Sequence, residues 1–473
     1  MMRSLFAGVA GLRTHQTRMD VIGNNIANVN TTAYKSQSMT FSDLMYQTTQ
    51  AASGANATTG IGGVNARQIG LGSKTSAIKT AISTQGASQT TNDPFDVMIT
   101  GDAFFVVSNG STNFFTRDGS FYIDGKGNLA MTSNGYNVMG WYPDNDPANA
   151  GNIKEDTVKP IRIMTPDNMT YPPEATTKAT VSGLVDKNDT DIGSTSGRIM
   201  NLDFFDNQGY KYTAKLSIHK IDGDKGQFYV QLDDILNSDG KSVTALVADG
   251  GNGLDPANIK LTTAVNTNTA TNNPGGGWGS ATLNYVEGKG TFENVNDTAG
   301  TAGGKTIALH FEGIANFSDI EIDFSNTNNF NANGTSTVGA VAGEPNGNGS
   351  GRKEGKMSGI TIQKDGKIYA AYDNGCNKLI AQIAVATFSN PSGLAKEGDN
   401  LYSATMNSGE FNGIGEDITA GGGYMNSGIL EMSNVDLAAE FTEMITTQRG
   451  FQANSRIITV SDTLLEELTN LKR

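Results

Sequence analysis

The sequence has one cysteine, Cys376, among its 473 residues, and three histidines. A single cysteine excludes an intrachain disulfide framework. The histidines are His15, His219 and His310, and the sequence around them offers no nucleophile and orienting acid of the kind that a catalytic triad requires. We therefore expect a protein that is not an enzyme and has no catalytic residues.

Long apolar runs are also missing. No stretch approaches the roughly 20 consecutive apolar residues of a transmembrane helix. A signal peptide needs an apolar core near its start, and Arg13, His15 and Arg18 interrupt the first apolar stretch. We expect no membrane insertion, and a chain that either is cytoplasmic or is exported with its N-terminus uncleaved.

Basic residues are in the minority, and the formal net charge of −14 argues against nucleic acid and anionic membranes as partners. Residues 222–224 begin like a calcium loop, but Gln227 stands where that loop needs glycine. A phosphate-binding loop at Gly355-Lys356 would need glycine five residues earlier, where Ser350 stands. We expect no metal and no cofactor.

Residues 1–30 and 431–473 each predict an amphipathic helix. Apolar residues recur at steps of four and three, the spacing of a coiled-coil seam, with Gln16 and Gly23 as interruptions. The seam residues are Leu5, Val9, Leu12, Met19 and Ile26 in the first helix and Leu437, Phe441, Met444, Phe451, Ile458, Leu465 and Leu468 in the second. The first helix is net positive and the second net negative, which favours pairing between them. Two such helices at opposite ends favour a role in assembly.

The middle of the chain is rich in glycine, with 58 in the whole sequence, and predicts short strands joined by tight turns. Phe104 to Val107 is an apolar run, and strand patterns are separated by Asp124-Gly125 and Asn134-Gly135 turns. Similar patterns return at 358–390. The predicted fold class is α+β and multidomain: the terminal helices form a coiled-coil domain, and nested, mainly antiparallel β-domains lie between them.

The predicted domains follow this nesting. Residues 1–30 and 431–473 form the helical core domain, and 31–75 form an irregular connector. Residues 76–142 and 356–430 form an inner β-domain. Residues 143–355, with prolines near their start and low-complexity spans, form an inserted outer β-domain that could comprise two lobes.

Four blocks of the sequence resemble the flagellar rod and hook protein family. They are NNIANVNTTAYK at 24–35, DPFDVMITGDAFFVV at 93–107, LIAQIAVATFSNPSGL at 379–394, and SNVDLAAEF at 433–441 with TQRGFQAN at 447–454. The motif residues are Asn28, Asn30, Thr31, Tyr34, Lys35, Asn434, Asp436, Gln448 and Arg449. Ala33 departs from the family, which commonly has glycine there, and this reduces backbone freedom at that position.

The resemblance covers about 1–142 and 356–473, and the long insertion favours the hook branch over the shorter rod proteins. It implies a homopolymer: a helical tube outside the cell that acts as a flexible universal joint and transmits torque from rod to filament. It also implies flagellar rod, hook cap and hook-filament junction proteins as partners, and export by the flagellar type III apparatus.

Two alternatives remain open at the level of sequence. A distal rod protein would form a straight, rigid tube instead of a curved one. A β-rich surface adhesin would need an aromatic glycan-binding groove in 143–355, where Trp278 lies in a glycine-rich loop. Cys376 follows the turn Asn374-Gly375 and is either a small turn residue or a thiol that cross-links subunits.

Overall fold

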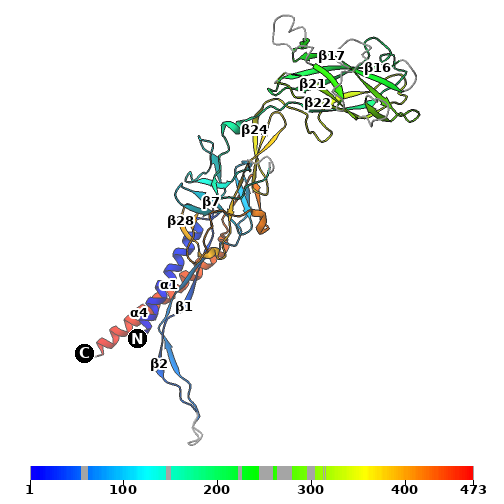
Figure 1. The fold of residues 1–473 in the computed structure, drawn as a ribbon. Coiled ribbons are helices and arrows are strands. Elements are labelled where there is room, and N and C mark those ends of the chain that lie inside the picture. The colour runs from blue at the N-terminus through cyan, green and yellow to red at the C-terminus, as the bar shows by residue number, and fades with distance from the viewer. Residues whose placement is uncertain are drawn as a thin grey trace. The chain divides into compact units, whose positions relative to one another are not determined.

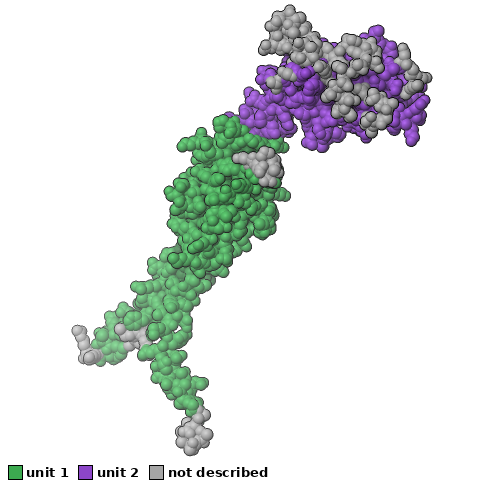
Figure 2. Space-filling model, viewed as in Figure 1, with its two compact units in different colours: residues 1–168, 359–371, 377–473 green, residues 169–358, 372–376 purple. Residues whose placement is uncertain are grey.

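The computed structural model describes residues 2–54, 62–144, 151–221, 226–243, 259–263, 280–295, 304–312, 314 and 316–471. The calcium-loop candidate at 222–224 and Trp278 lie outside these ranges. The chain divides into two compact units (Figure 2). Unit 1 comprises Met1–Asn168, Gly359–Ala371 and Asn377–Arg473, and unit 2 comprises Met169–Ser358 and Tyr372–Cys376.

Unit 1 contains the two terminal helices, α1 (Met2–Ala27) and α4 (Leu437–Asn470), which pack side by side and antiparallel (Figure 1). α4 begins after Asp436, whose carboxylate accepts hydrogen bonds from the backbone N–H groups of Ala438 and Ala439. An acidic N-cap of this kind satisfies donors that a helix start leaves free. None of the described helices is long and apolar enough to cross a membrane.

Residues 31–75, expected to be irregular, contain most of a two-part antiparallel ribbon. β1 (Gln37–Asp43) pairs with β4 (Ser73–Thr80), and β2 (Tyr46–Gln50) pairs with β3 (Arg67–Gly70). Nearly every ribbon residue is partly or fully exposed, so no alternation between buried and exposed positions marked these strands in the sequence. The ribbon packs on α1, where the ring of Phe41 lies 5.5 Å from that of His15.

The inner β-domain of unit 1 is built on one sheet with β7 near its centre. Along this sheet the strand order is β24-β25-β26-β11-β7-β8-β29-β28. The strands are β7 (Phe104–Ser108), β8 (Asn113–Thr116), β11 (Asn137–Trp141), β24 (Gly355–Ile362), β25 (Lys367–Tyr372), β26 (Asn377–Ile383), β28 (Ala395–Gly398) and β29 (Leu401–Ser403). All five residues of β7 are buried, as the apolar run predicted.

Shorter elements complete unit 1. They are β5 (Ser88–Thr90), β6 (Val97–Thr100), β9 (Phe121–Ile123), β10 (Leu129–Met131), β12 (Lys159–Pro160), β27 (Val385–Ala386), β30 (Tyr424–Ser427), β31 (Ile429–Glu431), the helix α2 (Pro166–Met169), and the 3-10 helices η3 (Pro391–Gly393) and η4 (Ile418–Gly421). β31 pairs with β5 and β30 with β6, which ties the chain before α4 to the first half of the β-domain.

Unit 2 is a sandwich of two five-stranded sheets. One has the order β18-β21-β22-β14-β23 and the other β15-β16-β17-β19-β20. The strands are β14 (Lys178–Leu184), β15 (Arg198–Phe205), β16 (Lys211–Lys220), β17 (Gln227–Asn237), β18 (Ile259–Thr263), β19 (Ser280–Tyr285), β20 (Phe292–Val295), β21 (Thr306–Phe311), β22 (Ile320–Asn328) and β23 (Gly339–Ala342), with the short β13 (Thr170–Tyr171) beside β24.

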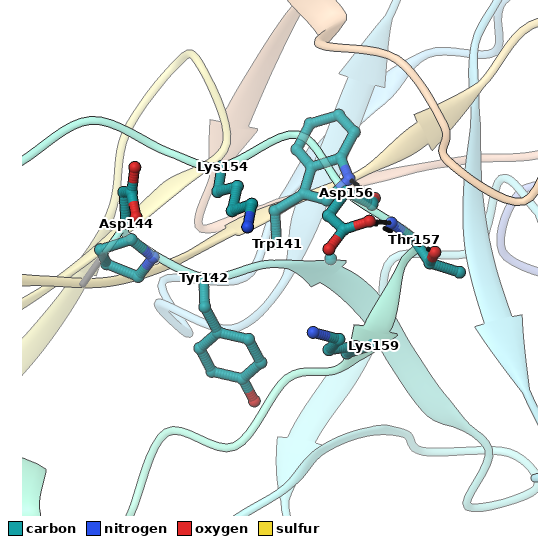
Figure 3. A pocket seen from close by; sticks show the side chains of 9 residues that line it. Trp141, Tyr142, Asp144, Lys154, Asp156, Thr157 and Lys159 are labelled. Carbon is teal, nitrogen blue, oxygen red and sulfur yellow. Dashed lines mark hydrogen bonds between the residues drawn. The ribbon is translucent and has the colours of Figure 1, made fainter. Parts of the chain in front are cut away.

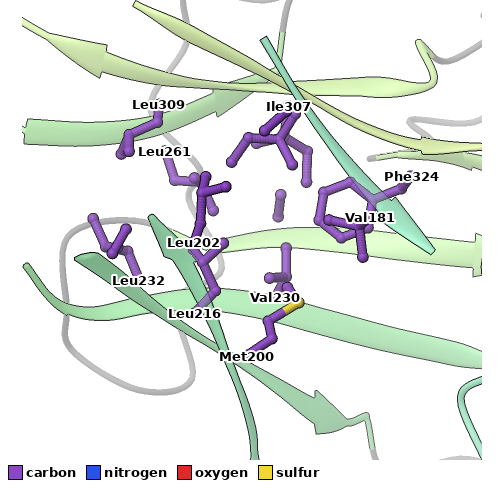
Figure 4. Close-up of a cluster of buried hydrophobic side chains, with 14 of the residues drawn as sticks. Val181, Met200, Leu202, Leu216, Val230, Leu232, Leu261, Ile307, Leu309 and Phe324 are labelled. Atoms are coloured by element: carbon purple, nitrogen blue, oxygen red, sulfur yellow. The ribbon is translucent and has the colours of Figure 1, made fainter. Parts of the chain in front are cut away.

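Both sheets of unit 2 contribute to one apolar core, where residues such as Leu202 and Leu216 face Ile307 and Leu309 (Figure 4). β14 and β22 run parallel, while the neighbouring strand pairs in this unit are antiparallel. The prediction of an α+β chain, with paired terminal helices and mainly antiparallel β-structure between them, is confirmed.

Two buried aspartates hold a loop of the sandwich in place through hydrogen bonds from backbone N–H groups. Asp186 accepts hydrogen bonds from the backbone N–H groups of Asn188, Ala332 and Gly334 at 2.7–2.9 Å. Asp189 accepts one from the N–H of Ser336 at 2.7 Å. The three N–H groups on Asp186 lower its pKa, because they stabilise the ionised form.

We predict that Asp186→Asn lowers the thermal midpoint of unit 2 at neutral pH, because the amide cannot accept all three hydrogen bonds. Because the pKa of Asp186 is lowered in the folded chain, ionised Asp186 stabilises the fold at pH values above the ordinary aspartate pKa. This stabilisation is lost as the pH falls through the lowered pKa of the folded state. Calorimetry of the full chain at neutral and acidic pH measures this. The exposed Asp239→Asn is the control, and equal midpoints for the two variants at neutral pH would contradict the prediction.

Candidate assembly surface

The contact between α1 and α4 is made largely by small and polar residues. A Cβ atom added at Gly11 would lie 2.6 Å from the side chain of Asn454, and one added at Gly450 would lie 2.6 Å from the ring of His15. A Cβ atom added at Gly8 would lie 3.3 Å from the side chain of Ile458 and 3.5 Å from the carbonyl oxygen of Asn454. The distance between packed helices depends on the side chains at the contact. The glycines therefore allow the two helices to lie close together.

Polar groups fix the register of this contact. Arg18 forms an ion pair with Glu443 at 3.0 Å, and Asn25 donates a hydrogen bond to Glu440 Oε1 at 2.8 Å. Burial is the main cause that raises the pKa of Glu440. The oxygen atoms of Ser4 and Ser461 lie 3.5 Å apart near the other end. The order of these partners shows directly that the helices run antiparallel.

The predicted apolar seam is not the face of α1 that meets α4. The observed contact is made by Gly8, Gly11, His15, Arg18 and Asn25. Each of these residues comes one position before a residue of the predicted seam or its interruption at Gln16. One residue corresponds to about 100° of rotation around a helix with 3.6 residues per turn. The seam therefore lies on a neighbouring face of α1.

None of the twelve predicted seam residues is buried. Leu5, Leu12, Met19, Ile26, Met444, Ile458 and Leu465 are partly buried, and Val9, Leu437, Phe441, Phe451 and Leu468 are exposed by 37–50%. Further exposed apolar side chains lie beside them: Phe6, Ile445, Ile457, Val460 and Leu464. We call these seam residues and their exposed neighbours the apolar helix faces. Large exposed apolar patches are typical of protein interaction sites.

The helices join the β-domain through a buried ionic cluster. Lys35 follows α1 in the chain and Glu431 precedes α4, and Lys35 Nζ lies 2.7 Å from Glu431 Oε1 with both side chains 1% exposed. Arg117 lies 3.9 Å from the second oxygen of Glu431 and 5.0 Å above the ring of Phe104. Burial is the main cause that lowers the pKa values of Lys35 and Arg117, and Glu431 opposes it.

Hydrogen bonds from motif residues surround this cluster. Asn434 accepts a bond from the N–H of Ser36 and donates to the carbonyls of Ala81 and Thr84. Lys35 also donates to the Thr84 carbonyl. Together with the ionic cluster, these contacts define the junction between the helices and the β-domain.

The turn after α1 is held by the first motif. Tyr34 donates to Asn25 Oδ1, and Thr31 donates to Asn28 Oδ1. Ala33 has a φ of 53°, in the left-handed region that favours glycine, and its N–H donates to the carbonyl of Glu431. The departure at Ala33 thus falls at a position with special backbone geometry.

The remaining predicted residues lie elsewhere. Asn30 is exposed in the turn after α1, and Gln448 and Arg449 are exposed on α4. Cys376 belongs to unit 2, is 9% exposed, and accepts a hydrogen bond from Arg352. Cross-linking through Cys376 stays a prediction, and its burial would first have to be relieved.

Among the residues that the structure describes, the cavities and polar clusters show no catalytic arrangement. A cavity of about 270 Å³ is lined by Trp141, Asp156 and two lysines, while Tyr142 points away from Asp144 and Lys154 (Figure 3). In unit 2, Ser217 lies between His219 and Asp233 but is fully buried. Over the ranges that the structure describes, no three His, Cys, Asp or Glu residues group as metal ligands would.

Comparison with known proteins decides the family. The flagellar hook protein FlgE of Borreliella burgdorferi is 34% identical over 494 residues, with 100% of both chains covered. FlgE of Treponema pallidum is 34% identical over 493 residues, again with 100% of both chains covered. The chain belongs to the flagellar hook protein family. It is a hook subunit of the extracellular flagellum and a structural protein, not an enzyme.

Family models match three parts of the hook subunit. The flagella basal body rod protein model matches residues 5–35, the flagellar hook protein FlgE/F/G D1 domain model matches 98–183, and the flagellar basal body rod FlgEFG protein C-terminal model matches 426–471. The basal-body rod protein FlgG of Bacillus subtilis is 28% identical over 473 residues, with 100% of both chains covered. This identity to a rod protein is lower than the 34% identity to the FlgE proteins of Borreliella burgdorferi and Treponema pallidum.

Several structural residues of the hook subunit were missed by sequence reasoning. Gly8, Gly11 and Gly450 form the helix contact, and Arg117 and Glu431 complete the ionic cluster. The glycines carried a signal, since Gly8 and Gly11 are three residues apart in a helical pattern where glycine costs about 1 kcal/mol relative to Ala. Arg117 carried none, because its partner is more than 300 residues away in the sequence.

We predict that Glu431→Ala destabilises unit 1 by about 3–5 kcal/mol, because it leaves Lys35 and Arg117 as buried charges without their partner. Glu443→Ala removes the partner of an exposed ion pair and should cost no more than about 1 kcal/mol. Chemical denaturation of the full-length monomers measures both values. Similar losses in the two variants would contradict the special role of the buried cluster.

We also predict opposite effects for two glycine substitutions in the helices. Gly23→Ala should stabilise α1 by about 1 kcal/mol, because no atom lies within 4 Å of the added methyl group. Gly450→Ala should weaken the helix pair, since its methyl group would meet the ring of His15. Thermal melting followed by circular dichroism at 222 nm, a helix-sensitive wavelength, would show a higher and a lower midpoint, respectively.

Proposed function

We propose that this hook subunit polymerises with itself through the apolar helix faces of α1 and α4. The observation that carries the proposal is the exposure of these faces: Phe6 is 65% exposed and Phe441 is 50% exposed in the single chain. The residues recur at coiled-coil spacing, so helices of neighbouring subunits can cover them.

The energetics support association. Fully burying a large apolar side chain contributes about 1.5–3 kcal/mol, and each subunit exposes several of them. The contact within the subunit, by contrast, uses mainly glycines and polar side chains, with Ile457 and Ile458 against Gly8, and leaves most of the apolar groups exposed. Folding and assembly therefore draw on different faces of the same two helices.

The polymer would be a helical tube that acts as a universal joint and transmits torque from rod to filament. Torque transmission needs a firm connection between the helices and the β-domain of unit 1, and the buried cluster of Lys35, Glu431 and Arg117 supports such a connection. Bending needs contacts that can slide, and exposed polar contacts worth about 0–1 kcal/mol each suit that purpose.

The proposed partners are the flagellar rod, the hook cap and the hook-filament junction proteins, which would meet the ends of the tube. The proposed export route is the flagellar type III apparatus, with the N-terminus uncleaved. Export through a narrow channel favours termini that fold weakly on their own. Gly23 and the use of small residues at the contact between α1 and α4 support this proposal.

Curvature separates a hook from a rod. Electron microscopy of polymers assembled from the purified subunit should show curved tubes. Straight, rigid tubes would instead favour rod-like behaviour, for which the likeness to FlgG of Bacillus subtilis is the motivating observation.

We predict that Leu12→Asp and Phe441→Asp each abolish polymerisation and leave the β-domains folded, because a carboxylate on an apolar face opposes its burial between subunits. Electron microscopy scores the tubes, and near-ultraviolet circular dichroism scores the β-domains. Thr442→Asp places the same charge on an exposed polar position of α4 and should still assemble. Normal tubes from either of the first two variants would refute the proposal.

A further inference from the structure

The inner β-domain carries one strongly protruding apolar side chain. Met406 has a relative exposure of 107%, the highest among the large apolar side chains that the structure describes. It lies in the turn after β29. Leaving a methionine entirely in water forgoes the free energy that burial would provide.

The turn around Met406 is well supported by hydrogen bonds. The N–H of Thr405 donates to Ser408 Oγ at 2.8 Å, and the Thr405 hydroxyl donates to the carbonyl of Gly393 at 2.6 Å. Asn390 donates to the carbonyl of Asn407 at 2.9 Å. Met406 is therefore presented on an ordered turn, and fixing it in an interface costs little additional backbone entropy.

A groove of matching character lies elsewhere on unit 1. It has a volume of about 700 Å³ and is lined by the apolar or aromatic residues Ile362, Tyr424, Met425 and Ile429. Polar residues also line it: Gln363, Lys364, Asp365, Thr419, Asn426 and Ser427. Tyr424 is 42% exposed and offers an aromatic surface to an incoming apolar side chain.

The protruding methionine and the groove lie at different ends of the same sheet. Met406 follows β29, whereas Ile362 ends β24, and the order between them is β24-β25-β26-β11-β7-β8-β29. Six steps between neighbouring strands correspond to a path of roughly 29 Å measured along the sheet. We therefore consider a second copy of the chain as the source of the methionine that enters the groove.

We propose that Met406 of one hook subunit inserts into the groove lined by Ile362, Tyr424, Met425 and Ile429 of a second copy. This inference rests on the proposed polymerisation. A contact between two different patches on identical chains is heterologous, and repeating it produces a ring or a helical filament. A subunit of a tube needs such contacts, and this pair supplies one outside the helices.

The chemistry of the two sides fits. Methionine is unbranched and adapts to irregular apolar space, and its sulfur packs favourably against aromatic rings such as that of Tyr424. The exposed polar neighbour Asn407 would meet the polar residues that line the groove. A flexible methionine also tolerates small shifts of its partner, which suits a polymer that bends.

Directed disulfide formation tests this inference in assembled polymers. In a Cys376→Ser background, subunits with Met406→Cys are mixed and assembled with subunits that carry Tyr424→Cys or Ser427→Cys, and are then oxidised. We expect disulfide-linked dimers that join position 406 of one chain to 424 or 427 of another, identified by mass spectrometry of peptides. A disulfide requires Cα atoms about 4.4–6.8 Å apart.

The matched control is Ser111→Cys, an exposed position in the turn between β7 and β8, mixed with the same acceptor variants. Assembly with no more linkage from position 406 than from 111 would overturn the inference and leave the proposed polymerisation intact. Failure of the unsubstituted chain to form tubes would overturn both. In the Cys376→Ser background, Met406→Leu should assemble normally and Met406→Asp should slow assembly several-fold; equal rates would contradict the inference.

Discussion

The close contact between α1 and α4 is the constraint on which the rest of this hook subunit depends. It is made where side chains are small: Gly8 and Gly11 on α1 and Gly450 on α4. Because these positions carry no Cβ atom, the helices approach closely, and polar pairs such as Arg18 with Glu443 set their register. Apart from Ile457 and Ile458, which lie against Gly8, most of the larger apolar side chains of the two helices are partly or fully exposed in the single chain.

In the proposed polymer, this division would separate the interactions within a subunit from those between subunits. A helix pair that buried its own leucines and phenylalanines would be more stable alone and would offer less surface to a neighbour. Here the single chain leaves Phe6, Phe441 and Leu468 at least half exposed. The exposed apolar surface of the helix pair thus follows from packing that places small residues at the contact.

The junction beyond the helices has the opposite character, because it is buried and charged. Lys35, Glu431 and Arg117 come from three distant parts of the sequence and meet where the chain enters and leaves the β-domain. A buried ion pair is weak evidence for stability, since desolvation opposes the attraction. Its geometric demand is strict, however, and it defines one arrangement of the helices on the β-domain.

Local patterns in the sequence were sufficient to predict the two terminal helices, the buried strand β7, many hairpins and the α+β class, because seam spacing and Asn-Gly or Asp-Gly turns depend on nearby residues. The ribbon of β1 to β4 escaped prediction because its exposed strands show no alternation. Tertiary structure alone decided which face of α1 meets α4, which charges meet around Glu431, and where Met406 lies relative to the groove. These features join residues hundreds of positions apart, and a local pattern carries no information about which distant surface will cover it.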